Sequence, residues 1–134
     1  YGPTISPPRQ VKPEAGIFLE FAPIGRSHER PYAGQTRKET AEPIEMLEAN
    51  LEVFDASKAQ VLEYWLDVSR FSRWQRPAVK IPWKRDVFLA DLQAYRRRGI
   101  RHVTSFACYI DADYERMYQD LRFIEEYGQG LLAG

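Results

Sequence analysis

The chain has 134 residues, which suits one domain and leaves little room for two. Its 19 lysines and arginines balance 19 aspartates and glutamates, so the formal net charge is zero. Nucleic acids and anionic membranes attract an excess of positive charge, so this balance argues against both as partners. The single cysteine, Cys108, excludes a disulfide within the chain and a cysteine-based zinc site.

Residues 1–15 are rich in proline and are predicted to form an extended arm, because proline fixes φ and removes a backbone donor. The remaining residues, 16–134, are expected to form the domain. Neither a signal peptide nor an apolar stretch of about 20 residues, the length that spans a bilayer, is recognisable. The first residue is not methionine, so we expect a chain that is processed or cut from something longer.

The first β/α unit begins with the apolar run 17–24, which is short enough to be a buried strand. Residues 25–35 are polar, contain glycine and proline, and are predicted to form a loop. A helix is expected from about Thr40, with Pro43 in its first turn. Its apolar side chains recur at helical spacing on one face: Ile44, Leu47, Leu51 and Phe54.

The same order of elements then repeats twice. A second strand is predicted at 60–67, a long loop at 69–83 and a helix at 84–98, with Gly99 at the left-handed position that ends a helix. The third strand is predicted at 102–110. Asp111 or Asp113 would cap the last helix, which Gly128 and Gly130 would close. The apolar stripe expected to be buried on it is Tyr114, Met117, Leu121 and Ile124.

The predicted strands start about 42 to 43 residues apart, a length typical of one β/α unit with a long loop. The expected fold is therefore α/β, with three consecutive β/α units and parallel strands. Right-handed crossovers place all helices on one face of such a sheet. Closing a barrel takes about eight strands. We therefore expect the C-terminal part of a (β/α)8 barrel; the alternatives are association with other chains and cover from the N-terminal arm.

Candidate site residues cluster where the strands are expected to end, because barrel active sites lie at that edge. Glu63, Trp65 and Asp67 alternate along the second strand, and Arg70 and Trp74 follow on the loop. Aromatic rings suit the apolar face of a sugar, and charged groups suit its hydroxyls. The pattern therefore predicts a carbohydrate ligand, with Asp67 about 13 Å beyond Glu63 at the rim.

Glu20 and Glu63 both stand fourth in their predicted strands, so they are candidates for a catalytic carboxylate pair. Glycosidases hold such pairs about 5 to 5.5 Å apart when retaining and about 6.5 to 9.5 Å apart when inverting. The alternative is that one carboxylate pairs with Arg26 or Arg70 inside the barrel. His28 is expected either to bind substrate or shuttle protons, or to be a surface histidine hydrogen-bonded to Glu29 or Asp67.

Metal and nucleotide motifs are not recognisable in the sequence. The two histidines, His28 and His102, are far apart and lack the spacing of a metal site. Neither a phosphate-binding loop nor a dinucleotide fingerprint is present. We therefore expect no metal and no cofactor.

The run FLEFAPIGRSH at 18–28 resembles a segment of the bacterial family DUF4838, in which a strand ends in a phrase like FAPI.R followed by histidine. The resemblance continues through 64–67, 71–72 and 95–100, and covers roughly residues 1 to 130 as the C-terminal part of a longer domain. It implies a bacterial TIM barrel related to glycoside hydrolases. Because no signal peptide or transmembrane segment is recognisable, we expect the chain in the bacterial cytoplasm.

The leading hypothesis is a portion of a glycoside hydrolase. Glu63 and Glu20 are the candidate catalytic residues, and the sugar pocket would be shaped by Arg26, His28, Trp65, Asp67, Arg70 and Trp74. Two alternatives keep the fold without the reaction. One is a non-catalytic carbohydrate-binding domain. The other is a scaffold or oligomerisation domain whose bare sheet face meets the rest of a longer chain or further copies.

Overall fold

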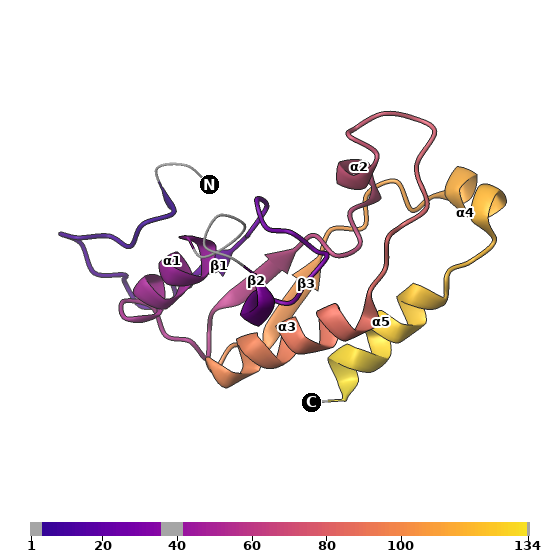
Figure 1. The fold of residues 1–134 in the computed structure, drawn as a ribbon. Coiled ribbons are helices and arrows are strands. Elements are labelled where there is room, and N and C mark those ends of the chain that lie inside the picture. The colour runs from indigo at the N-terminus through magenta and orange to yellow at the C-terminus, as the bar shows by residue number, and fades with distance from the viewer. Residues whose placement is uncertain (1–3, 36–41, 134) are drawn as a thin grey trace.

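The computed structural model describes residues 4–35 and 42–133 (Figure 1). It contains a three-stranded parallel sheet with the order β1-β2-β3. The strands are β1 (Glu20–Phe21), β2 (Gln60–Glu63) and β3 (His102–Ser105). The predicted mixed α/β class with sequential parallel strands is confirmed.

Each strand is shorter than its apolar run predicted. β1 ends two residues before Pro23, which cannot donate to a ladder. After β2 the chain turns, and the Asp67 N–H donates to the Tyr64 carbonyl at 3.2 Å. Residues 64–66 are nevertheless buried, because the turn packs into the core. Burial therefore continues beyond the strand, which is why the apolar run overestimated its length.

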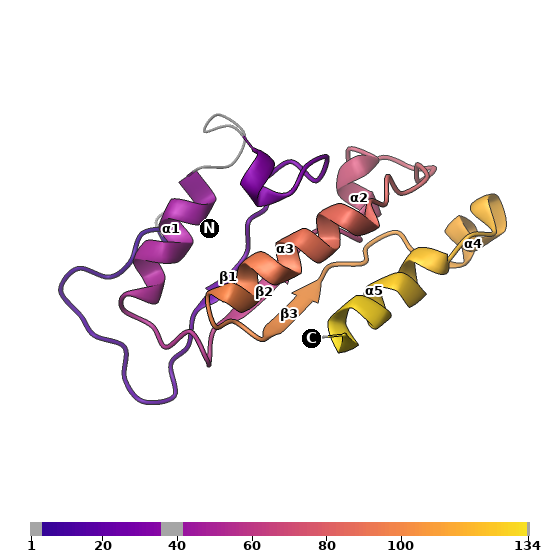
Figure 2. The same ribbon diagram turned by 60° about the horizontal axis from the view of Figure 1, so that its bottom comes forward.

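Helices α1 (Glu42–Leu51) and α3 (Arg85–Arg97) pack on one face of the sheet (Figure 2). Leu47 of α1 and Phe88 of α3 share a core with Phe21 and Val61 of the strands. The predicted helix 84–98 is confirmed, and Gly99 follows it with the left-handed φ of 84°. The predicted start of the first helix at Thr40 lies outside the described residues.

The final segment forms two helices, so the prediction of one continuous helix is wrong. They are α4 (Ala112–Tyr118) and α5 (Arg122–Leu132), separated at Gln119, whose φ is 48°. The break changes which side chains are buried: Met117 is 49% and Ile124 42% exposed, whereas Phe123 is buried. Gly128 and Gly130 lie within α5 and do not end it.

Two short helices interrupt segments that were predicted to be loops. They are the 3-10 helix η2 (Tyr32–Gly34) and α2 (Val68–Phe71). Across the described parts of the chain, no helix is long and apolar enough to cross a membrane.

The sheet face opposite the helices stays open. Glu20, Gln60 and His102 are in register across the three strands and are exposed, as is Thr104. The N-terminal arm lies beside α1 instead of covering this face, since Asn50 Nδ2 donates to the Ile5 carbonyl at 2.9 Å. Helices α1 and α3, which connect the three strands, therefore share one face as expected, and the described part of the arm does not cover the other.

Candidate functional site

Glu63, the last residue of β2, lies in a fully buried cluster on the helix-covered face of the sheet. Its side chain shares that face with Val61 of the core. Glu63 Oε1 lies 2.6 Å from the Tyr95 hydroxyl and 3.3 Å from the Tyr32 hydroxyl. Glu63 Oε2 lies 3.2 Å from His28 Nε2. The segment after β1 and helix α3 thus meet at the end of the neighbouring strand.

Arg26 lies between two carboxylates in this cluster. Its Nη1 atom is 3.0 Å from Glu63 Oε1 and 2.6 Å from Asp91 Oδ2, and all three side chains are fully buried. The guanidinium also lies over the Tyr32 ring, 4.0 Å from its centroid. The alternative in which a carboxylate pairs with Arg26 is the arrangement that the structure has. We call Arg26, His28, Glu63 and Asp91 the buried ion network.

Asp91 of α3 is a member that sequence reasoning missed. It accepts hydrogen bonds from the Trp65 indole N–H at 3.1 Å and from the Tyr32 backbone N–H at 3.0 Å. The signal was present in the sequence, because Asp91 falls among Phe88, Leu92 and Tyr95 on the apolar stripe of its helix. A carboxylate at such a position needs a buried partner.

The pKa values of the two carboxylates in the network are shifted in opposite directions. Burial opposes ionisation of Glu63, but Arg26 and the hydrogen bond with His28 outweigh it and lower the pKa of Glu63 to about 2. Burial raises the pKa of Asp91 above its ordinary value despite the attraction of Arg26. Glu63 is therefore an enclosed anion at neutral pH, with neither the proton of a general acid nor contact with solvent.

Glu20 does not lie opposite Glu63 in the sheet, so the prediction that these two carboxylates form a catalytic pair is wrong. Glu20 is the first residue of β1 and is in register with Gln60, three residues before Glu63. It is exposed on the open sheet face, whereas Glu63 faces the helices. The strand begins later than its apolar run suggested, and this shift moved Glu20 away from the end of the sheet.

The other predicted pocket residues are spread over different environments. Trp65 is 4% and Asp67 5% exposed, so neither presents its side chain to a ligand in this structure. Arg70 lies over the Tyr64 ring at 5.0 Å. Trp74, in contrast, is 68% exposed. Among the predicted residues, Arg26 and His28 contact Glu63 directly, and Trp65 joins them through Asp91. The other predicted residues lie outside this cluster.

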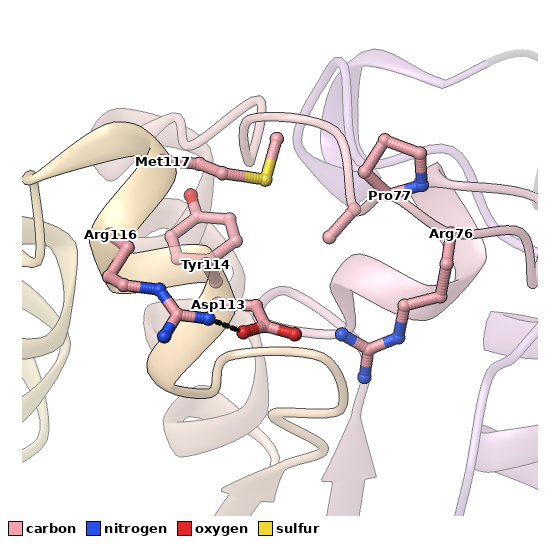
Figure 3. A pocket seen from close by; sticks show the side chains of 7 residues that line it. Arg76, Pro77, Asp113, Tyr114, Arg116 and Met117 are labelled. Atoms are coloured by element: carbon pink, nitrogen blue, oxygen red, sulfur yellow. Dashed lines mark hydrogen bonds and ion pairs between the residues drawn. The ribbon is translucent and has the colours of Figure 1, made fainter.

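A pocket of about 550 Å³ lies between the loop after α2 and helix α4 (Figure 3). We call it the loop pocket, and it is lined by Arg76, Pro77, Ala78, Asp113, Tyr114, Arg116 and Met117. It lies beyond the carboxyl ends of β2 and β3, the edge at which parallel sheets bind ligands. The predicted site residues Arg70 and Trp74 precede Arg76 in the chain, but none of the residues that line the pocket was among the predicted site residues.

Charged groups of the loop pocket are held in pairs. Arg76 Nη2 lies 2.7 Å from Asp111 Oδ2, and its guanidinium lies 4.0 Å from the centre of the Tyr109 ring. Arg116 pairs with Asp113, which lies between the two arginines in Figure 3. Stacking on Tyr109 holds the plane of the Arg76 guanidinium.

The loop after α2 and the loop after β3 contain unusual backbone conformations. Arg73, Trp74 and Tyr109 have φ values of 52°, 57° and 67°, which residues other than glycine seldom adopt. The Tyr109 hydroxyl donates to the Trp74 carbonyl at 3.3 Å and ties the loops together. Such conformations cost free energy and concentrate at functional sites. Trp74, whose side chain is exposed, stands two residues before Arg76 of the pocket lining.

The described residues contain no group of three or more histidine, cysteine, aspartate or glutamate side chains that could hold a metal ion. No family model, curated protein sequence or solved structure matches the chain.

Proposed function

We propose that this chain is a non-catalytic carbohydrate-binding domain whose ligand occupies the loop pocket. The observation that carries the proposal is the pocket of about 550 Å³ at the carboxyl edge of the sheet, with an exposed tryptophan, Trp74, on the loop that supplies part of its lining. The resemblance of the sequence to a barrel family related to glycoside hydrolases supports the same class of ligand.

The lining of the loop pocket suits the two surfaces of a sugar ring. Met117 and Pro77 are exposed and offer apolar contact for C–H groups. Arg76 and Asp113 supply donors and acceptors for hydroxyl groups. Because exposed ion pairs contribute only about 0 to 1 kcal/mol, these groups can turn toward a ligand at small cost.

The buried ion network argues against hydrolysis by Glu63 as the function. Glu63 is fully enclosed and anionic, and Glu20 lies on the opposite face of the sheet. Glycoside hydrolysis needs two carboxyl groups flanking the same glycosidic bond. The structure thus favours the binding alternative over the catalytic one, within a domain that we regard as part of a larger β/α barrel.

The proposal is tested by titrating the ¹⁵N-labelled chain with a panel of neutral and acidic oligosaccharides. We expect amide shifts confined to residues 73–78 and 109–117 for at least one sugar. Trp74→Ala and Arg76→Ala should each weaken binding about tenfold or more, a loss of about 1.4 kcal/mol. Arg85→Ala, an exposed arginine outside the loop pocket, is the matched control and should bind normally.

Glu63→Gln separates the two functions. Binding should persist in this variant wherever it remains folded, and the wild-type chain should release no product from the sugars that it binds. Turnover that disappears in Glu63→Gln would restore the hydrolase hypothesis. Shifts elsewhere, or an effect of Arg85→Ala equal to that of Arg76→Ala, would contradict the loop pocket.

A further inference from the structure

Residues 68–85 form a basic stretch in a chain whose formal net charge is zero. The stretch contains six arginines and lysines and no aspartate or glutamate. It begins with α2, continues through the loop that supplies Arg76, Pro77 and Ala78 to the loop pocket, and ends at the start of α3 (Figure 1). One wall of the loop pocket therefore belongs to a segment that is strongly positive.

Carboxylates of other segments neutralise only three of the six cations. The three ion pairs, all partly exposed, are Arg76 with Asp111, Lys80 with Asp120 and Lys84 with Glu29. Among the residues that the structure describes, no carboxylate forms an ion pair with Arg70, Arg73 or Arg85. Half of the positive charge of the basic stretch thus meets no anion of the described chain.

Arg70 is held in place although it has no anionic partner. Its guanidinium lies over the Tyr64 ring, 5.0 Å from the centroid, and the residue is half-buried. Tyr64 follows β2 and is only 2% exposed, so its ring is a firm support. A guanidinium that is already stacked loses less freedom on binding, and its planar fork matches the two oxygens of a carboxylate. Arg70 is therefore prepared for an anion that a ligand would supply.

The loop after α2 joins Arg70 to two further arginines. The Arg73 N–H donates to the Arg70 carbonyl at 2.9 Å, which closes a tight turn. Arg73 is exposed and has a φ of 52°. The Tyr109 hydroxyl donates to the Trp74 carbonyl, and the Tyr109 ring also supports Arg76. Arg70, Arg73 and Arg76 thus recur every three residues along one anchored loop.

We propose that the ligand of the loop pocket is an acidic oligosaccharide whose carboxylates pair with Arg70 and Arg73. The inference rests on the proposed carbohydrate-binding function and specifies its class of ligand. An oligomer of a uronic acid has one carboxylate on each ring, so its charges recur along the ligand as the arginines recur along the loop. Its rings would contact the exposed side chains of Trp74 and Met117. A neutral sugar would make only this second kind of contact.

Matched pairs of ligands test the role of the carboxylates. The probes are hexamers of galacturonate, mannuronate and glucuronate, each compared with its methyl ester, which keeps the rings and the length but loses the charge. By titration calorimetry, we expect at least one free acid to bind about tenfold or more tightly than its ester at low salt. The difference should shrink as salt rises.

The outcomes of this comparison separate the ligand class from the function. If no free acid binds more tightly than its ester while any sugar of the panel binds the loop pocket, the acidic ligand is overturned and the carbohydrate-binding function stands. If no sugar binds at all, both are overturned.

Single substitutions locate the carboxylates on the protein. Arg70→Gln and Arg73→Gln should each weaken the preferred free acid about fivefold or more and leave the affinity for its ester unchanged. Because Arg73 is exposed, its variant keeps the test valid even if Arg70→Gln unfolds the chain. Arg85→Gln is the matched control, since it removes an arginine of the same basic stretch that lies in α3. Equal losses in all three variants would show a response to overall charge and would overturn the proposal.

Single-stranded DNA distinguishes a saccharide from polyanions in general. A DNA hexamer carries regularly spaced phosphate charges and no sugar ring of the uronic acid kind. It should bind at least about tenfold more weakly than the preferred free acid at the same salt concentration. DNA that binds as tightly, and that loses affinity to the same extent in Arg70→Gln, would overturn the saccharide in favour of a nucleic acid.

Discussion

Arg26 is surrounded by carboxylates that come from different elements of the fold. Glu63 ends β2 and Asp91 lies in α3, and both contact the same Nη1 atom. Removing charges from water is costly, and their mutual attraction compensates only while every partner is in place. The network is therefore sensitive to the loss of one member, although its intact form need not exceed an apolar core in stability.

We expect Glu63→Gln to lower the free energy of unfolding by about 3 kcal/mol or more, because it leaves the buried Arg26 with one anion instead of two. Urea denaturation followed by circular dichroism measures the change. Glu20→Gln, an exposed carboxylate on the open face, should change stability by no more than about 0.5 kcal/mol. Similar effects of the two substitutions would contradict the role given to the network.

Acid should remove part of this stabilisation. The pKa of Glu63 is lowered from 4.5 to about 2 in the folded chain, so its contribution is complete above pH 4.5 and is lost as pH falls toward 2. The shift corresponds to about 3 kcal/mol. Asp91 acts in the opposite sense, since its raised pKa favours folding when it is protonated.

The comparison of wild type with Glu63→Gln isolates Glu63 from Asp91, because Asp91 is present in both. We expect their difference in unfolding free energy to narrow between about pH 5 and pH 2, as measured by urea denaturation at each pH. A difference that stays constant over this range would mean that Glu63 titrates with its ordinary pKa.

Sequence reasoning found several residues of the network but not its purpose. Arg26, His28 and Glu63 were selected because they follow the ends of neighbouring parallel strands, and such ends meet in space. Whether the carboxylate would face a substrate or a guanidinium depends on which face of the strand it occupies. That face is set by the register with β3 and by Asp91. A single sequence does not contain the register.

At the scale of elements, α5 depends on close contact with α3. A Cβ atom at Gly130 would clash with the Phe88 ring, because it would lie 2.9 Å from the ring's Cζ atom, which is closer than van der Waals contact. That ring is fully buried. A Cβ atom at Gly128, two residues earlier on the same helix, would contact nothing within 4 Å. Glycine at Gly130 is thus needed for the approach of the helices, and glycine at Gly128 is not.

We expect Gly130→Ala to destabilise the chain by about 1 to 3 kcal/mol through overpacking. Gly128→Ala should raise stability by up to about 1 kcal/mol, because alanine favours the helix. Thermal denaturation of the two variants side by side measures both effects. Stabilisation by Gly130→Ala would show that the two helices can move apart freely.

The elements themselves were predicted to different degrees. The apolar spacing of α3 and its terminal glycine identified that helix almost to the residue, because tertiary contacts reinforce the periodicity. The final segment was misread, since Gln119 adopts a left-handed conformation that glycine or asparagine usually signals. Asp111 was correctly named as a helix cap, and its side chain accepts from the Tyr114 N–H at 3.1 Å.

As a whole, the molecule has helices α1 and α3 packed on one face of a short parallel sheet, and the other face is open. The order of elements predicted this arrangement because parallel crossovers are right-handed. The loop pocket lies beyond the carboxyl ends of the strands, away from the open face of the sheet. The sequence indicated this end through the site residues predicted on its loops.

The buried ion network also affects the order in which the chain can fold. Its three charged members, Arg26, Glu63 and Asp91, are far apart in sequence, and they meet only after β1, β2 and α3 have assembled. Their desolvation should therefore follow the rate-limiting step of folding, in which contacts nearer in sequence form first. Glu63→Gln should then accelerate unfolding while leaving the refolding rate nearly unchanged in stopped-flow measurements. The charges at the end of β2 would thus set how long the chain stays folded more than how quickly it folds.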